Sequence, residues 1–404
     1  MVNLDFDASG HLLGIEVLDA SAILPVDEAL RQTSALVAEA GAADLVFLFA
    51  SHAYAEDFPA LVRRAYEATR ARVLVGCSGQ GVIGTAREVE GEPALALLAL
   101  SLPGATLRAA RFTQETLEVC RQPADWQREA FVEPSEVNAW LVFGDPFRMD
   151  VEALVGGLAA AYPGRPLVGG LASGDQRAQR THVFLDERVY DEGAVAVALG
   201  GAYTVRCVVS QGAEPIGEPW TITGARGHLV ETISQRPALE VLVSTLEALP
   251  PEVRERAQRN LLVGLAMDER RAEFGRGDFL IRNLIGLNRA SGALAISAHP
   301  RIGQTLQFQI RDARAADEDL RVLLARSKEM SGEQRPVAAV LCSCNGRGVG
   351  LFGEPDHDAR TLAELLGVQA IAGFFCNGEI GPVGGRVFLH GYTASIALIV
   401  PAGA

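Results

Sequence analysis

The chain has 404 residues, of which 49% are hydrophobic and 21% charged, so it is long enough to bury full hydrophobic cores. Its formal net charge is −14, which argues against nucleic acid or an anionic membrane as the main partner, because both require a basic surface. The polar, acidic N-terminus and the short apolar runs predict a cytoplasmic protein without signal peptide or membrane insertion.

The first predicted unit alternates strands and a helix. An apolar run at Leu45–Ala50 predicts a buried strand, and Asp57–Thr69 has apolar residues at helical spacing. A second strand at Val73–Val75 runs into the glycine-rich segment Gly76–Gly81. Another apolar run, Ala94–Leu100, completes the unit.

The same order returns twice. In the second unit, strand, helix and strand are predicted at 140–143, 151–162 and 167–168, followed by GGLASG at Gly169–Gly174, a hairpin at 183–190 and a strand at 194–199. The third unit has them at 337–342, 358–366 and 370–375, with a closing strand at 395–400. Continuous apolar strands joined by helices predict right-handed crossovers. The predicted class is α/β, with repeated strand-helix-strand units in mixed, largely buried sheets.

The segment Gly212–Gly227 separates the second and third units and is rich in glycine and proline, which indicates a boundary. A helix at Ala238–Leu249 and four strand-like segments follow, and a charged helix at Asp312–Lys328 leads into the third unit. We therefore predict two domains. Residues 1–213 hold two repeated units, and residues 214–404 hold the third.

The first glycine-rich segment contains a literal GxGxxG at Gly79, Gly81 and Gly84. A dinucleotide site needs a helix to open there, whereas Gly91 and Pro93 soon interrupt the chain, so we reject this reading. Close packing of strand ends is one interpretation of such turns, and ligand contact through backbone N–H groups is the other. Cys77, Ser78 and Gly79 are thus secondary candidates.

The third unit places opposite charges at two strand ends. CSCNGRG ends one strand and carries Arg347, and GFFCNGEIGP ends the next and carries Glu379. These side chains could form a structural ion pair, or they could bind the carboxylate and the ammonium of a zwitterion such as an amino acid. The predicted ligand-binding residues are Arg347, Glu379, Asn345, Gly346, Gly348, Asn377, Gly378, His390 and Arg282.

Two alternatives remain open. One is haem held by a single axial histidine, His390 or His52, although no CxxCH is present and no other cofactor or metal is predicted. The other is a hydrolase with Cys344 or Cys376 as nucleophile and His390 as base, for which no orienting third residue is found. Reduced, buried core thiols are the plainer interpretation of the six cysteines. We predict a binding protein and not an enzyme.

The glycine-rich segments and their surroundings resemble the FIST proteins, a sensory family with an N-terminal and a C-terminal FIST domain. The similarity covers most of the chain. The matching segments are LVGCSGQGVIG (Leu74–Gly84), Glu92–Leu100, PLVGGLASGD (Pro166–Asp175), RPALEV (Arg236–Val241), FLIRNLIGLN (Phe279–Asn288), CNGRG (Cys344–Gly348), GFFCNGEIGP (Gly373–Pro382) and LHGYTAS (Leu389–Ser395).

The resemblance implies a sensor of small ligands, with amino acids suggested, and a similarity to haem-carrying nitric-oxide sensors in some bacterial members. Other members are fused to kinase or cyclase modules. This sequence shows no such module, so the resemblance implies that a separate signalling protein receives the signal.

Overall fold

The computed structural model describes residues 2–6, 12–17, 42–175, 177–331 and 335–403. The fold is α/β with mixed sheets, as predicted. Two compact units are present: unit 1 comprises Met1–Val209, Arg321–Leu389 and Thr393–Ala404, and unit 2 comprises Ser210–Leu320 and His390–Tyr392. The units are defined by packing alone, so the division into domains 1–213 and 214–404 stays a prediction.

Unit 1 contains the three predicted repeats. In each, two parallel strands are joined by a crossover helix, and a third strand pairs antiparallel with the first. The elements are, in repeat order, β3 (Leu45–Ser51), α2 (Phe58–Thr69), β4 (Val73–Gly79) and β7 (Leu95–Leu100); β9 (Ala139–Gly144), α5 (Val151–Ala161), β10 (Leu167–Leu171) and β13 (Ala194–Gly201); β22 (Ala338–Cys344), α10 (His357–Leu366), β23 (Ile371–Cys376) and β26 (Thr393–Pro401).

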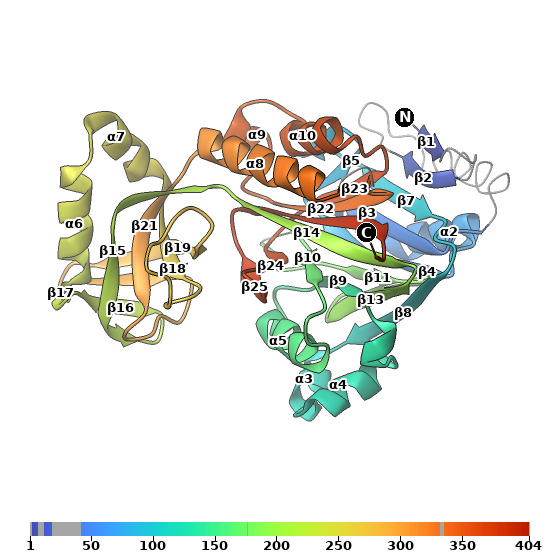
Figure 1. Ribbon diagram of the computed structural model, residues 1–404, viewed down its shortest axis with the longest axis horizontal. Helices are drawn as coiled ribbons and strands as arrows, with labels where there is room; N and C mark the ends of the chain where they lie inside the picture. The colour runs from blue at the N-terminus through green and yellow to red at the C-terminus, as the bar shows by residue number, and fades with distance from the viewer. Residues whose placement is uncertain (1, 7–11, 18–41, 176, 332–334, 404) are drawn as a thin grey trace. The chain divides into compact units, whose positions relative to one another are not determined.

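A hairpin follows the second strand of each repeat and pairs with the sheet of a different repeat. The hairpin β5 (Gly81–Gly84) and β6 (Arg87–Glu90) joins β23 of the third repeat. The hairpin β11 (Val183–Leu185) and β12 (Arg188–Tyr190) joins β4 of the first. The hairpin β24 (Glu379–Val383) and β25 (Arg386–His390), red in Figure 1, joins the green β10 of the second. The exchange closes a ring in which every repeat completes another.

One glycine in the second strand of each repeat allows the two parallel strands to pair closely. A Cβ added at Gly76, Gly169 or Gly373 would lie within 1.9 Å of a carbonyl oxygen on the neighbouring parallel strand. No side chain fits there. These three glycines therefore mark equivalent positions in the repeats, and other residues can be compared by their distance in sequence from them.

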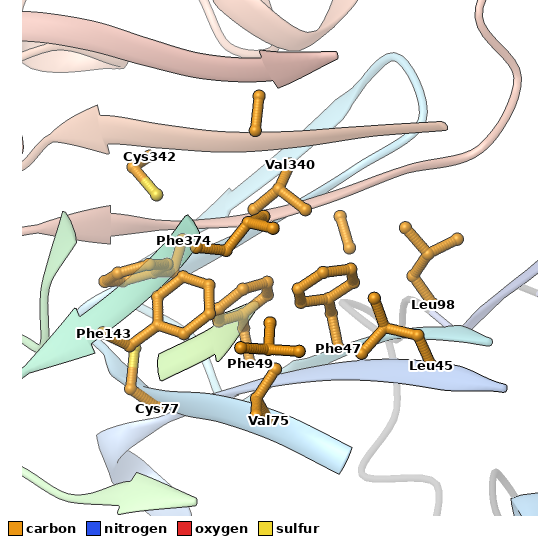
Figure 2. Packing of buried hydrophobic residues seen from close by; sticks show 14 of the residues in the cluster. Leu45, Phe47, Phe49, Val75, Cys77, Leu98, Phe143, Val340, Cys342 and Phe374 are labelled. Carbon is orange, nitrogen blue, oxygen red and sulfur yellow. The ribbon is translucent and has the colours of Figure 1, made fainter. Parts of the chain in front are cut away.

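The sheets of unit 1 share a core of apolar side chains. The rings of Phe49 and Phe374 stack with centroids 4.9 Å apart, and Phe143 meets Phe49 edge-on at 5.3 Å. Figure 2 shows these rings, which come from three different repeats, packed together beside Cys77 and Cys342. The core thus joins the repeats directly, with aromatic geometry that adds to the hydrophobic contribution.

The remaining elements of unit 1 flank these sheets. A two-stranded sheet is formed by β1 (Val2–Phe6) and β2 (Leu12–Val17). Strand β8 (Ala105–Phe112) pairs with β13, and β14 (Tyr203–Gln211), which reaches the start of unit 2, is the edge strand beside β26. The other helices are η1 (His52–Tyr54), α3 (Gln114–Val119), α4 (Pro123–Ala130), η2 (Pro134–Glu136), α8 (Ala313–Ser331), which begins in unit 2, and α9 (Val349–Phe352).

Unit 2 is a seven-stranded, antiparallel sheet with two helices and its own apolar core. Its elements are β15 (Ala213–Arg226), β16 (Leu229–Ile233), β17 (Arg236–Pro237), α6 (Ala238–Ala248), α7 (Pro251–Asn260), β18 (Leu261–Ala266), β19 (Phe279–Asn288), β20 (Ala293–Ile296) and β21 (Thr305–Arg311). The proline-rich boundary segment is itself strand β15. Its pairing with β21 shifts register between Ile216 and Trp220, which accommodates Gly217 and Pro219.

Candidate ligand-binding site

A cavity of about 570 Å³ lies in unit 1 at the ends of the repeated strands. We call it the central pocket. Its lining comes from all three repeats, and the carboxyl ends of parallel strands are where ligands commonly bind in α/β folds. The side chains and backbone that line it are Ser51, His52, Ala53, Gln80, Gly81, Glu90, Gly91, Glu92, Gly174, Asp175, Arg177, Asn345 and Phe375.

Hydrogen bonds between the repeats fix the turns beneath the pocket. The buried Ser173 hydroxyl donates to the carbonyl of Phe375 at 2.5 Å and accepts from the backbone N–H of Gln80 at 2.7 Å. The Ser78 hydroxyl donates to the Ser173 carbonyl at 2.8 Å. Because each bond joins different strand ends, the lining is held in place before any ligand arrives.

The pocket carries charges of both signs. Asp175 accepts hydrogen bonds from the backbone N–H groups of Ala178 and Arg177, and these lower the pKa of its carboxyl group. Burial raises the pKa of Glu90, an effect opposed by a hydrogen bond from the N–H of Val349. Glu92 and the exposed Arg177 complete the charged lining, and Arg177 forms no ion pair within the described part of the chain. Acidic groups and a guanidinium thus face one cavity.

Several predicted residues lie at this end of the sheets. Asn345 lines the pocket, donates from Nδ2 to Oδ1 of Asn377 at 2.9 Å, and has an Oδ1 that is shielded from solvent and finds no partner among the described residues. Asn377 in turn donates to the carbonyl of Ala172. Gly378 packs against Leu171, and Gly346 is half-buried in the turn after β22.

Gly348 has φ of +62°, and a Cβ there would lie 2.3 Å from a carboxylate oxygen of Glu90. Only glycine lets this backbone approach the carboxylate that also lines the pocket.

Arg347 and Glu379 form hydrogen bonds with different partners. Arg347 is buried and binds Asp358 of α10 with two hydrogen bonds, from Nε at 2.6 Å and from Nη2 at 2.9 Å. Burial alone would raise the pKa of Asp358, but the guanidinium holds it well below its usual range. The guanidinium of Arg347 therefore directs its paired hydrogen bonds to a carboxylate of this chain. Such a pair is costly to break from one side only.

Glu379 is fully buried at the start of β24. Its carboxylate accepts from the backbone N–H of Thr393 at 3.0 Å, from the hydroxyl of Thr393 at 2.7 Å and from the thiol of Cys376 at 3.2 Å. Burial raises its pKa to about 7, although these hydrogen bonds oppose the rise. The group therefore titrates close to neutral pH.

His390 and Arg282 lie in unit 2, where Arg282 pairs in register with Val263 on β18. His52 is exposed and lines the central pocket in unit 1. A haem needs an apolar pocket beside its axial histidine. The lining around His52 carries Glu90, Glu92 and Asp175 and does not fit that group.

The candidate cysteines lie in buried or half-buried surroundings. Burial raises the pKa of Cys376 well above its ordinary value, and the neighbouring Glu379 carboxylate raises it further. Burial likewise raises the pKa of Cys77. A raised pKa lowers the fraction of thiolate, which is the nucleophilic form of a cysteine. Cys344 is half-buried and also hydrogen-bonds Glu379, and Gly79 packs against Gly81 and Phe374.

Sequence reasoning missed the pocket residues of the first two repeats, above all Gln80, Asp175 and Arg177, because their turns were considered for close packing or backbone contact and not for their side chains. A signal was present. Gln80, Ser173 and Asn377 each lie four residues after the equivalent glycines Gly76, Gly169 and Gly373, so one polar position recurs in every repeat. Within the described residues, no group of three or more His, Cys, Asp or Glu side chains is arranged to hold a metal ion.

The comparisons with known proteins agree on the family. A model of the FIST N domain matches residues 44–236, and a model of the FIST C domain matches residues 238–382. An uncharacterized protein of Mycobacterium tuberculosis is 38% identical over 361 residues, which is 89% of this chain and 92% of that protein. An uncharacterized protein of Mycobacterium bovis is 37% identical over 362 residues, covering 89% and 91%.

Among solved structures, the cyanuric acid hydrolase of A. caulinodans aligns over 96% of this chain and 99% of its own, with 12% identity and a TM-score of 0.35. A similarity this low says nothing about activity. No helix within the described residues is both long and apolar enough to span a bilayer. The family models and the relatives together cover nearly the same part of the sequence as the motifs noted above, and they show that the chain belongs to the FIST family.

Proposed function

We propose that this FIST protein binds a small zwitterion of the amino-acid class in the central pocket and acts as a sensor that signals through a separate partner protein. The observation that carries the proposal is the lining, in which three carboxylates and one guanidinium share a cavity of about 570 Å³. That volume lies within the range of ordinary small-molecule sites. An ammonium and a carboxylate on one ligand would match both signs.

The residues suggest definite roles. Arg177 offers a guanidinium with no ion pair among the described residues, which suits a ligand carboxylate. Asp175 remains ionised because its pKa is lowered, and with Glu92 it suits an ammonium. Asn345 offers its unpartnered Oδ1 as an acceptor for a ligand N–H. In this proposal Arg177 supplies the positive charge of the site, and Asp175 and Glu92 supply the negative charge. Arg347 and Glu379 stabilise the turns through their own hydrogen bonds.

Binding without catalysis is part of the proposal. The raised pKa of Cys376 keeps its thiol protonated at neutral pH, which speaks against the hydrolase alternative. The charged lining speaks against haem at His52.

A thermal-shift screen against free amino acids and their decarboxylated and N-acetylated forms tests the proposal. A ligand at 100 times its Kd stabilises the native state by about 2.7 kcal/mol, which is a readily measured shift. We expect a free amino acid to stabilise the protein. We expect Arg177→Gln to lose most of that shift, because the ligand carboxylate loses its guanidinium.

The matched control is Arg188→Gln, which removes the same charge from an exposed residue of β12 outside the pocket. Its shift should equal that of the unmodified protein. A screen in which no amino acid stabilises the protein, or one in which both variants respond alike, would refute the zwitterion site.

A further inference from the structure

A second cavity of unit 1 is lined by two arginines and by no acidic side chain. It has a volume of about 470 Å³ and lies between the turn that precedes β10 and the turn of the β24–β25 hairpin. Arg165 comes from the first turn and Arg386 from the second, and neither forms an ion pair within the part of the chain that the structure describes. In a chain with 50 acidic and 36 basic residues, two unneutralised guanidiniums beside one cavity are unusual.

We infer that this cavity is a binding site for a small phosphorylated molecule, separate from the central pocket. Guanidinium groups match the planar geometry of phosphate oxygens and bind them with paired hydrogen bonds. Pro166, Pro382 and Val387 give the cavity an apolar wall. The volume exceeds the needs of a lone phosphate, so the wall suits an organic body that carries the phosphoryl group.

The backbone beside the arginines is open. Gly164 and Gly385 line the cavity with φ of +75° and +78°, and an added Cβ at either position would meet no atom within 4 Å. Ligand oxygens can therefore come close to these turns, as they do in other glycine-rich anion sites. The guanidinium of Arg386 lies 5.3 Å from the ring centroid of Phe388, a cation–π contact that favours one orientation of the long side chain.

The repeats supply an internal comparison. The second strand of each exchanged hairpin begins with an arginine: Arg87, Arg188 and Arg386. The turn before Arg188 is Asp186–Glu187, and Asp186 accepts the backbone N–H of Leu74 at the start of β4. The turn before Arg386 is Gly384–Gly385, without charge. Carboxylates thus occupy the turn of the hairpin that pairs with the first repeat, whereas the turn of the hairpin that pairs with the second repeat carries no charge.

The position opposite the hairpin is an arginine in the first repeat as well, Arg72, and differs in the third repeat. Arg165 lies four residues before Gly169, and the residue four before Gly373 in the third repeat is Gln369, whose carbonyl accepts the hydroxyl of Thr85. A hydrogen bond between the turn of the third repeat and the hairpin of the first repeat therefore closes this corner. At the second repeat, by contrast, Arg165 and the hairpin residue Arg386 line one cavity beside an uncharged, glycine-lined turn.

Titration of the full-length protein with phenyl phosphate, followed by saturation-transfer NMR at constant ionic strength, tests the inference. Inorganic phosphate is the parallel probe and separates a phosphate ester from free phosphate as the ligand. We expect saturable binding of phenyl phosphate. Arg165→Gln and Arg386→Gln should each weaken it by about tenfold or more, because each removes a charge-assisted pair of hydrogen bonds.

Two controls make the result specific. Arg188→Gln removes the corresponding arginine of another hairpin, and Arg177→Gln removes the arginine of the central pocket; neither should change the affinity. Both replaced arginines of the inferred site are exposed, so their variants should keep the urea midpoint of the unmodified protein. Absence of saturable binding, or an equal loss in Arg188→Gln, overturns the inference. Equally tight binding of inorganic phosphate would support an anion site but overturn the phosphorylated organic ligand.

Discussion

At the scale of single residues, Glu379 illustrates how burial and hydrogen bonding oppose each other. Its carboxylate accepts hydrogen bonds from Thr393 and from thiols, all of which favour the ionised form. Arg347, the arginine considered together with Glu379 in the sequence analysis, forms its hydrogen bonds with Asp358 instead. Burial therefore prevails, and the pKa lies at about 7 and not at the ordinary 4.5.

This raised pKa predicts a loss of stability as pH rises. The unfolded carboxyl group releases its proton at lower pH than the folded one, so the free energy of unfolding falls between about pH 4.5 and pH 7. The difference corresponds to about 3 kcal/mol above pH 7. Urea unfolding from pH 5 to pH 8 should show this fall in the unmodified protein, and Glu379→Gln should lack it.

Glu88, whose pKa burial and the nearby Asp358 raise to about 8, contributes a fall of the same sign in both proteins. The informative quantity is thus the difference between the two pH curves. Curves that stay parallel from pH 5 to pH 8 would contradict the assignment to Glu379.

At the scale of elements, glycines determine how closely two neighbouring helices can approach each other. Residues 156 and 157 are neighbouring glycines in α5 with opposite surroundings. A Cβ added at Gly156 would meet no atom within 4 Å, whereas one at Gly157 would lie 2.1 Å from the ring of the buried Trp126 on α4. Comparing the same substitution at the two positions therefore separates the effect of helix propensity from the effect of packing between helices.

We predict opposite effects of one substitution at these neighbours. Gly156→Ala should stabilise the protein by about 0.5–1 kcal/mol, because alanine loses less backbone entropy in a helix. Gly157→Ala should destabilise it by about 1–3 kcal/mol, since the indole must shift in a packed core. Chemical denaturation of both variants measures the difference. Equal effects would mean that α4 and α5 do not pack as described.

At the scale of the whole molecule, the sequence predicted the three repeats well. Each repeat shows a local pattern of apolar runs, helical spacing and glycine-rich turns, and the rejected GxGxxG segment indeed forms strands and no helix. The exchange of hairpins was not predicted, because the pairing of Gly169 with Ile380 joins positions that are far apart in the chain. The local spacing of apolar residues does not indicate which distant strand a strand will pair with.

The candidate site was predicted only in part for the same reason. Asn345 was identified from the charged turns of the third repeat, and it does line the central pocket. The pairing of Arg347 with Asp358 was not predicted, because Asp358 follows on a helix that looked like an ordinary crossover. Gln80 and Arg177 were missed since only the fold brings their turns to the same cavity as Asn345.

The exchange predicts that fragments will differ in their ability to fold. Residues 42–209 alone would lack β24, which pairs with β10, and would leave β5 without β23, so this fragment should aggregate or stay molten. Residues 210–320 form a continuous segment with their own core and should unfold cooperatively. Circular dichroism and urea unfolding of both fragments provide the comparison. A cooperative transition of fragment 42–209 would contradict the role given to the exchanged hairpins.

The central claim is that one pocket recognises both charges of a zwitterion, and isothermal titration with three forms of one amino acid tests it most directly. The amino acid that gives the largest thermal shift is compared with its C-terminal amide and its N-acetyl derivative. The unmodified protein should bind the free amino acid at least about tenfold more tightly than either derivative, since each lacks one charge. In Arg177→Gln the free acid and the amide should bind alike. Tight binding of the N-acetyl derivative, or no binding of any free amino acid, would contradict the account.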